Sequence, residues 1–283
     1  MTKLKGKLKI ENKGFDSDIL NKYRDAIFSF FQDLYDNLNT DCDLVISLRK
    51  DINKTNKVPL GGRAIKKGNG FLVLIYDNSF CGDTEKDKLD NLFSVIYHEF
   101  VHVYDIINTY ANNYCTFKPD VKHEQETDII KQLGFDFWLE YRAFNMTMYK
   151  FEFIIKHNSL YKIYKQYCKL LTRLSGLNNM NDSKEKNKMV SDYVKDVDFF
   201  IYNIAITIAC LHNQNKVLKR YNDKTENDKN YIFIKKLFID LSLLCAKTHK
   251  GMFGKYQESR LEQIGKKILK LNDNLNVNVL YKT

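Results

Sequence analysis

The stretch IYHEFVHVYD, residues 96–105, carries two kinds of residue at helical spacing. Ile96, Phe100 and Val103 recur every three or four residues, which predicts a helix with this face in a core. His98 and His102 are four residues apart, so on the same helix their side chains project in a similar direction. This segment therefore requires a fold in which one helix face packs in a core and a second, polar face carries two histidines.

The first half of the chain alternates between strand and helix patterns. Short apolar or alternating segments predict strands, and spacing by threes and fours predicts helices. The expected strands cover 3–10, 43–48, 61–65 and 71–76, with a hairpin turn at 67–70. Helices are expected from Asp16 or Ser17 to Leu38 and from about Thr84, which Asp83 or Thr84 can cap.

The second half shows only helical patterns. The chain has 2 Pro and 12 Gly among 283 residues, which favours long helices. Helices are expected over 133–156, 158–174, 184–213, 228–248 and 256–271. We therefore predict an α+β fold, in which a small mixed sheet with an active-site helix precedes an all-helical C-terminal half. The expected domains are 1–150, which is catalytic, and 151–283, a helical subdomain packed on it.

The residues 98–102 have the arrangement His-Glu-x-x-His. Two neutral imidazoles on one helix face can bind a zinc ion, and the glutamate beside the first can act as a base toward a water molecule at the ion. The alternative is an ordinary buried helix whose polar stripe has this pattern by coincidence. The apolar residues Phe100 and Val101 at the two variable positions fit a buried helix in either case.

A hydrolytic zinc site needs a third protein ligand and one open position. Glu140 is the preferred candidate, because it lies in the strongly apolar segment FWLEYRAF, where a buried carboxylate needs a partner. The partner could instead be Arg142, or Glu140 could face solvent. His123 lies in a polar segment and is a weaker candidate ligand. Glu124 and Glu126 also remain as competitors.

HEFVHVYD followed by LEYRAF resembles the gluzincin zinc metallopeptidases. The nearer likeness is to the subset that has Asp three residues after the second His, which includes the catalytic domain of anthrax lethal factor. Peptidases of phages and mobile elements that cleave repressors share the general plan. The resemblance covers residues 98–144. It implies a zincin-like fold with zinc as cofactor.

The resemblance also implies roles for individual residues. His98, His102 and Glu140 would bind zinc, and Glu99 would be the general base. Asp105 would hold a ligand histidine in place; the alternative is an exposed helix residue. The oxyanion donor is left open among several side chains, namely Tyr104, Tyr110, Tyr141, Tyr149 and His212.

The expected partner is a protein or peptide substrate. In folds of this kind, the strand nearest the cleft aligns an extended peptide, which gives this role to 71–76 or its hairpin partner; a fully buried central strand is the alternative. The net charge of +10 comes from lysines spread along the whole chain, so nucleic acid is not expected as a partner. Neither a membrane span nor a secretory signal is visible, which favours the cytoplasm, although unconventional export stays open. The oligomeric state is not predicted.

These residues predict zinc-dependent hydrolysis of peptide bonds. Three rival functions remain. The chain could be a zincin-fold binding module that kept the metal and lost turnover. It could be a regulatory peptidase that acts on a separately encoded repressor. It could also be a basic nucleic-acid-binding protein with an incidental motif, for which steep salt dependence would be diagnostic.

Overall fold

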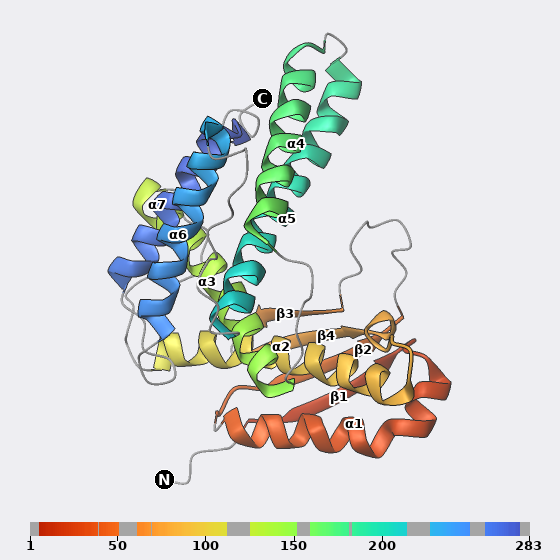
Figure 1. Cartoon of the computed structure of the whole chain (residues 1–283). Coiled ribbons are helices and arrows are strands. Elements are labelled where there is room, and N and C mark those ends of the chain that lie inside the picture. The colour runs from red at the N-terminus through yellow and green to blue at the C-terminus, as the bar shows by residue number, and fades with distance from the viewer. Residues whose placement is uncertain are drawn as a thin grey trace. The chain divides into compact units, whose positions relative to one another are not determined.

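The computed structural model describes residues 6–38, 40–50, 61–68, 70–111, 125–151, 159–180, 183–213, 227–249 and 258–277 (Figure 1). The chain forms two compact units, Met1–Asn112 and Asn113–Thr283. The first unit holds all the strands described below, and the second is built from helices. Each unit is described by itself.

The first unit is a four-stranded mixed sheet with two long helices. Its elements are β1 (Leu8–Lys13), α1 (Ser17–Leu38), β2 (Leu44–Arg49), β3 (Gly62–Lys67), β4 (Gly70–Tyr76), the short 3-10 helix η1 (Asp77–Ser79) and α2 (Glu85–Ala111). The strand order is β1-β2-β4-β3. β1, β2 and β4 are parallel to one another, whereas β3 is antiparallel to β4. β4 is therefore a central strand, and β3 forms one edge of the sheet.

Side chains alternate between the two faces of the sheet along each strand, and the helices cover the face that carries the apolar residues. Leu44, Ile46 and Leu48 of β2 are buried together with alternate residues of β4, and they share one core with α1 and α2. The α2 side of this core consists of its apolar stripe, namely Leu92, Ile96, Phe100 and Val103. This stripe fixes the rotation of α2 about its axis and thereby turns His98 and His102 away from the sheet core.

Both helices of the first unit begin at side chains that cap them. The Asp16 carboxylate accepts hydrogen bonds from the backbone N–H groups of Asp18 and Ile19, at 2.9 and 3.1 Å. Thr84 and Asp87 form a reciprocal pair: Thr84 Oγ1 accepts from Asp87 N at 3.1 Å, and the Asp87 carboxylate accepts from Thr84 N at 3.0 Å. These bonds from Thr84 lower the pKa of Asp87. The predicted caps at Asp16 and Thr84 are confirmed.

The second unit consists of helices packed on one another. They are α3 (Glu126–Phe151), α4 (Leu160–Asn178), α5 (Ser183–Asn213), α6 (Lys229–His249) and α7 (Glu258–Asn274). α3 packs against α5 and α7. The α3–α7 crossing is unusually close because a glycine lies on each helix: Gly134 meets the backbone of Leu261, and Gly265 meets the backbone of Ile130.

The α+β class with a helical second half is confirmed. The strands near 43–48, 61–65 and 71–76 are found within one or two residues of the prediction. The first strand runs from Leu8 to Lys13 and pairs along this length with Leu44–Arg49 of β2, whereas residues 3–5 of the predicted strand lie outside the described residues. α3 begins at Glu126, seven residues before the predicted start. α3 belongs to the second compact unit. The division into domains at residue 150 stays a prediction.

None of the helices in the described part of the chain has the length and apolar character that crossing a membrane requires.

Candidate metal centre

The two histidines of α2 point one ring nitrogen each at a common position. His98 Nε2 and His102 Nε2 are 3.1 Å apart, and the two rings are nearly perpendicular, at 85°. The separation of four residues predicted that both side chains lie on one face of the helix, and they do. The structure adds that the converging atoms are the two Nε2 nitrogens.

This separation fits two ligands of one ion. Two nitrogens bonded at about 2.0–2.1 Å to a tetrahedral zinc ion lie roughly 3.3 Å from each other. A hydrogen bond between one protonated and one unprotonated imidazole gives a similar nitrogen separation. The donor chemistry therefore suits zinc, and the distance between the nitrogens is compatible with it. The roles of both histidines as metal ligands stay a prediction.

The polar face of α2 is buried. Glu99, His102 and Asp105 are among the buried polar side chains, and Asp105 is only 1% exposed. The alternative of an exposed helix residue for Asp105 is therefore wrong. Asp105 lies three residues beyond His102, which puts both on the same side of the helix. A carboxylate in this position suits the predicted support of a ligand histidine.

Strand β3 runs beside this part of α2. Its first residue, Gly62, and the preceding Gly61 face the helix residues Glu99 and Val95. β4 lies between β2 and β3, so it has no free edge. Of the two strands predicted to align a peptide, only the hairpin partner β3 has an open edge within the described sheet. The sequence could not distinguish them, because strand order depends on pairing between distant segments.

Glu140 lies on α3 in the second unit. It is partly buried, and its neighbours Phe137, Trp138, Leu139 and Tyr141 are all buried. Asp136 lies one turn earlier, where its carboxylate accepts a bond from Gln132 Nε2 at 2.7 Å. Loss of solvation raises the pKa of Asp136 to about 6, and the negative charge of Glu140 contributes to this rise. Asp136 and Glu140 thus form an acidic stretch of α3.

The other candidate ligands are Glu126, His123 and Glu124. Glu126 is the first residue of α3, and its side chain is exposed. His123 and Glu124 lie outside the described residues. The Arg142 guanidinium is buried and lies over the Trp138 ring, 5.6 Å from its centroid.

Two candidate oxyanion donors, Tyr141 and His212, are hydrogen-bonded to each other within the helical unit. The Tyr141 hydroxyl is 2.8 Å from His212 Nδ1, and His212 Nε2 is 2.8 Å from Ser242 Oγ. Burial raises the pKa of Tyr141. This chain of hydrogen bonds ties α3, α5 and α6 together, and no local sequence signal predicts it, because the three residues are far apart in sequence. We interpret Tyr141 and His212 as parts of the helical core.

The other candidate donors differ in exposure. Tyr149 is 77% exposed and Tyr104 is partly buried, whereas the structure does not describe the side chain of Tyr110.

No protein-family model, curated protein or solved structure matches this chain. The likeness to gluzincins therefore depends on residues 98–144 alone.

Proposed function

We propose that this protein is a zinc-dependent metallopeptidase. The observation that carries the proposal is the convergence of His98 Nε2 and His102 Nε2 to 3.1 Å beside the buried Glu99, on a single helix. Such a grouping combines two neutral nitrogen donors with a carboxylate that is next to them and is not needed as a ligand. An ordinary amphipathic helix has no need for the buried Glu99 and His102 together with the partly buried His98.

In this proposal, Glu140 is the third ligand. His98, His102 and Glu140 each offer one ligand atom, an imidazole nitrogen from either histidine and a carboxylate oxygen from Glu140. Two histidines with one glutamate are a donor set of catalytic zinc sites, which leave one position open. Bound zinc would polarise the substrate carbonyl and lower the pKa of a water molecule.

The protein groups then manage the proton. Glu99 accepts a proton from the attacking water and passes it to the nitrogen of the leaving amine, so that the amine departs neutral. Glu99 is buried beside the two histidines, which places its carboxylate next to the position of the attacking water. The open edge of β3 would bind the substrate backbone in an extended conformation.

The experiment compares the native protein with Glu99→Gln, using Asp90→Asn, an exposed change on the same helix, as the control. Metal content is measured by mass spectrometry, and cleavage is measured on a mixed peptide library. We expect stoichiometric zinc in all three proteins and cleavage lowered by about 10²–10⁴-fold in Glu99→Gln alone. Full activity of Glu99→Gln, or native protein without zinc, would contradict the proposal. Zinc without any cleavage would instead favour a binding module.

A further inference from the structure

α6 is apolar on two opposite faces, and only one of them is used inside the helical unit. The buried face packs against α4, α5 and α7. It comprises Tyr231, Ile234, Leu237, Phe238, Leu241 and Cys245. On the other side, Ile232, Ile239 and Leu243 are exposed, at 52%, 36% and 57%. Apolar residues that gather on the solvent side of a helix mark a candidate contact with another molecule.

The exposed residues form a single stripe along the helix. Ile232, Lys236, Ile239 and Leu243 follow one another at intervals of four, three and four, and we call them the α6 stripe. These are the intervals of the a and d positions in a coiled coil, where a facing helix places its own apolar residues between them. A lysine at one such position reduces stability but fixes the register and the number of strands. The spacing is thus suited to one helix lying along α6.

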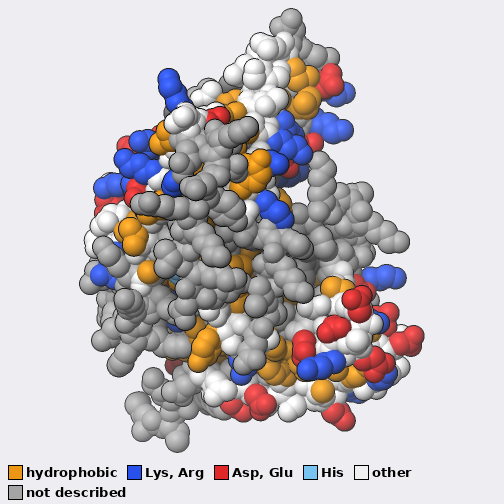
Figure 2. All heavy atoms as spheres, in the orientation of Figure 1, with side chains coloured by type: hydrophobic (Ala, Val, Ile, Leu, Met, Phe, Trp, Pro, Cys, Tyr) orange, Lys and Arg blue, Asp and Glu red, His pale blue; other side chains and the backbone are white. Residues whose placement is uncertain are grey.

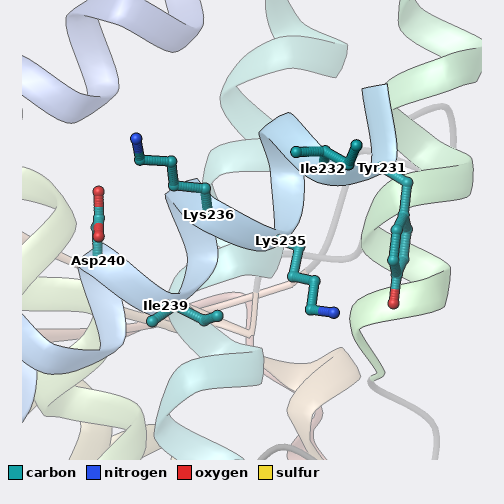
Figure 3. Close-up of a pocket in the computed structure, with 6 residues that line it drawn as sticks. All are labelled: Tyr231, Ile232, Lys235, Lys236, Ile239 and Asp240. Carbon is teal, nitrogen blue, oxygen red and sulfur yellow. The ribbon is translucent and has the colours of Figure 1, made fainter. Parts of the chain in front are cut away.

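The surface beside the stripe is hollowed. Tyr231, Lys235 and Asp240 line the hollow together with Ile232, Lys236 and Ile239 of the stripe, and its volume is about 370 Å³ (Figure 3). Lys235 lies over the Tyr231 ring, with Nζ 5.8 Å from the centroid. This depression gives a partner side chain room to enter beside the aliphatic residues.

Lysine predominates among the charges around the stripe. The exposed Asp228, one turn before Ile232, accepts hydrogen bonds from the backbone N–H groups of Asn230 and Tyr231 at the start of the helix. Lys229 and Lys236 are exposed, and Lys235 borders the hollow. The acidic residue there, Asp240, is paired with Lys267 of α7. On the face shown in Figure 2, lysine and arginine side chains are also frequent over the helices of this unit. A second copy of the stripe would bring lysines against lysines, whereas acidic side chains would complement them.

We infer that the α6 stripe is a docking surface for an amphipathic helix of another protein, with aliphatic residues at its centre and acidic residues along its flanks. The inference does not depend on the metal site. A lipid surface fits less well, because membrane-surface helices present a broad apolar face, whereas this stripe is one residue wide and contains Lys236. The narrow, basic-edged stripe matches helix-on-helix recognition.

The test uses the full-length protein and a synthetic helical peptide of about four heptads, with Leu or Ile at a and d and Glu at e and g. A second peptide has Lys in place of Glu. Binding is measured by titration and mapped by nuclear magnetic resonance. We expect the acidic peptide to bind at α6 at least tenfold more tightly than the basic one. Ile239→Ser/Leu243→Ser should weaken binding at least tenfold, whereas Tyr149→Ser, an exposed change on α3, should not.

Charge reversal provides the second arm. Lys235→Glu/Lys236→Glu should reverse the preference between the two peptides while the thermal unfolding midpoint stays unchanged. Absence of acidic-peptide binding, or binding that is indifferent to Ile239 and Leu243, overturns the inference. So does a homodimer, detected by sedimentation, that Ile239→Ser/Leu243→Ser abolishes, because the occupant is then a second copy. Binding to phosphatidylserine vesicles that the same variant abolishes overturns it in favour of a membrane surface.

Discussion

Gly62 of β3 lies directly against the side chain of Glu99 on α2. A Cβ atom added at residue 62 would be 2.7 Å from Glu99 Cγ and 3.0 Å from Glu99 Oε1. Contacts this short force a shift of one of the two groups. The missing side chain at residue 62 is therefore what allows the proposed base and the edge strand to lie side by side, and it makes Gly62 a positioning residue for Glu99.

Gly62→Ala should lower kcat by roughly 10–100-fold, because displacement of a catalytic group by about 1 Å is enough for such a loss. KM should change little, since the substrate-binding edge of β3 is retained. Gly61→Ala is the matched control, because its Cβ would be 2.9 Å from an aliphatic atom, Val95 Cγ2. Steady-state kinetics and zinc content check both variants. Equal loss of kcat in both would show that crowding of α2, and not the position of Glu99, is responsible.

Asp105→Asn should weaken zinc binding by about 10–100-fold, the usual cost of removing a carboxylate that supports a ligand histidine. The amide is of similar size, so the buried position stays filled, and α2 should remain folded. Competition with a zinc chelator measures the affinity. Asp90→Asn, on the exposed side of the same helix, should have native affinity. Native zinc affinity in Asp105→Asn, with a lowered unfolding temperature, would assign Asp105 to the core alone.

Glu140→Gln should weaken zinc binding by more than Asp105→Asn does, because it removes a ligand rather than the support of a ligand. Glu126→Gln is the control, since Glu126 is an exposed carboxylate on the same helix. Because a ligand stabilises the folded state more when it binds more tightly, zinc should raise the unfolding temperature of the native protein and much less that of Glu140→Gln. Equal zinc affinity in Glu140→Gln and Glu126→Gln would remove Glu140 from the ligand set.

Gly134→Ala should destabilise the helical unit by more than about 3 kcal/mol, because the added Cβ would be 1.8 Å from the Leu261 carbonyl oxygen on α7. Gly176→Ala in α4 is the opposite case, with no atom within 4 Å of the added Cβ. It should stabilise the protein by about 0.5–1 kcal/mol, since alanine favours a helix over glycine. Urea unfolding of the two variants measures both effects. A stability of Gly134→Ala close to the native value would mean that α3 and α7 can separate at little cost.

The sequence was sufficient for the elements whose cause is local. The spacing of Ile96, Phe100 and Val103 predicted the buried face of α2, and the interval between His98 and His102 predicted that they share a face. The capping side chains Asp16 and Thr84 marked the starts of α1 and α2. These features depend on neighbours within a few residues, so periodicity and side-chain chemistry determine them.

Only the tertiary structure decided the relations between distant segments. It placed β4 inside the sheet and β3 at its edge, because strand order follows from long-range pairing. It buried Asp105, which sequence reasoning left open between a supporting and an exposed role, and it engaged Tyr141 with His212. The closeness of Gly62 to Glu99 is of the same kind. The packing of β3 on α2 brings the two residues together, and no periodicity in the sequence records the packing of one element on another.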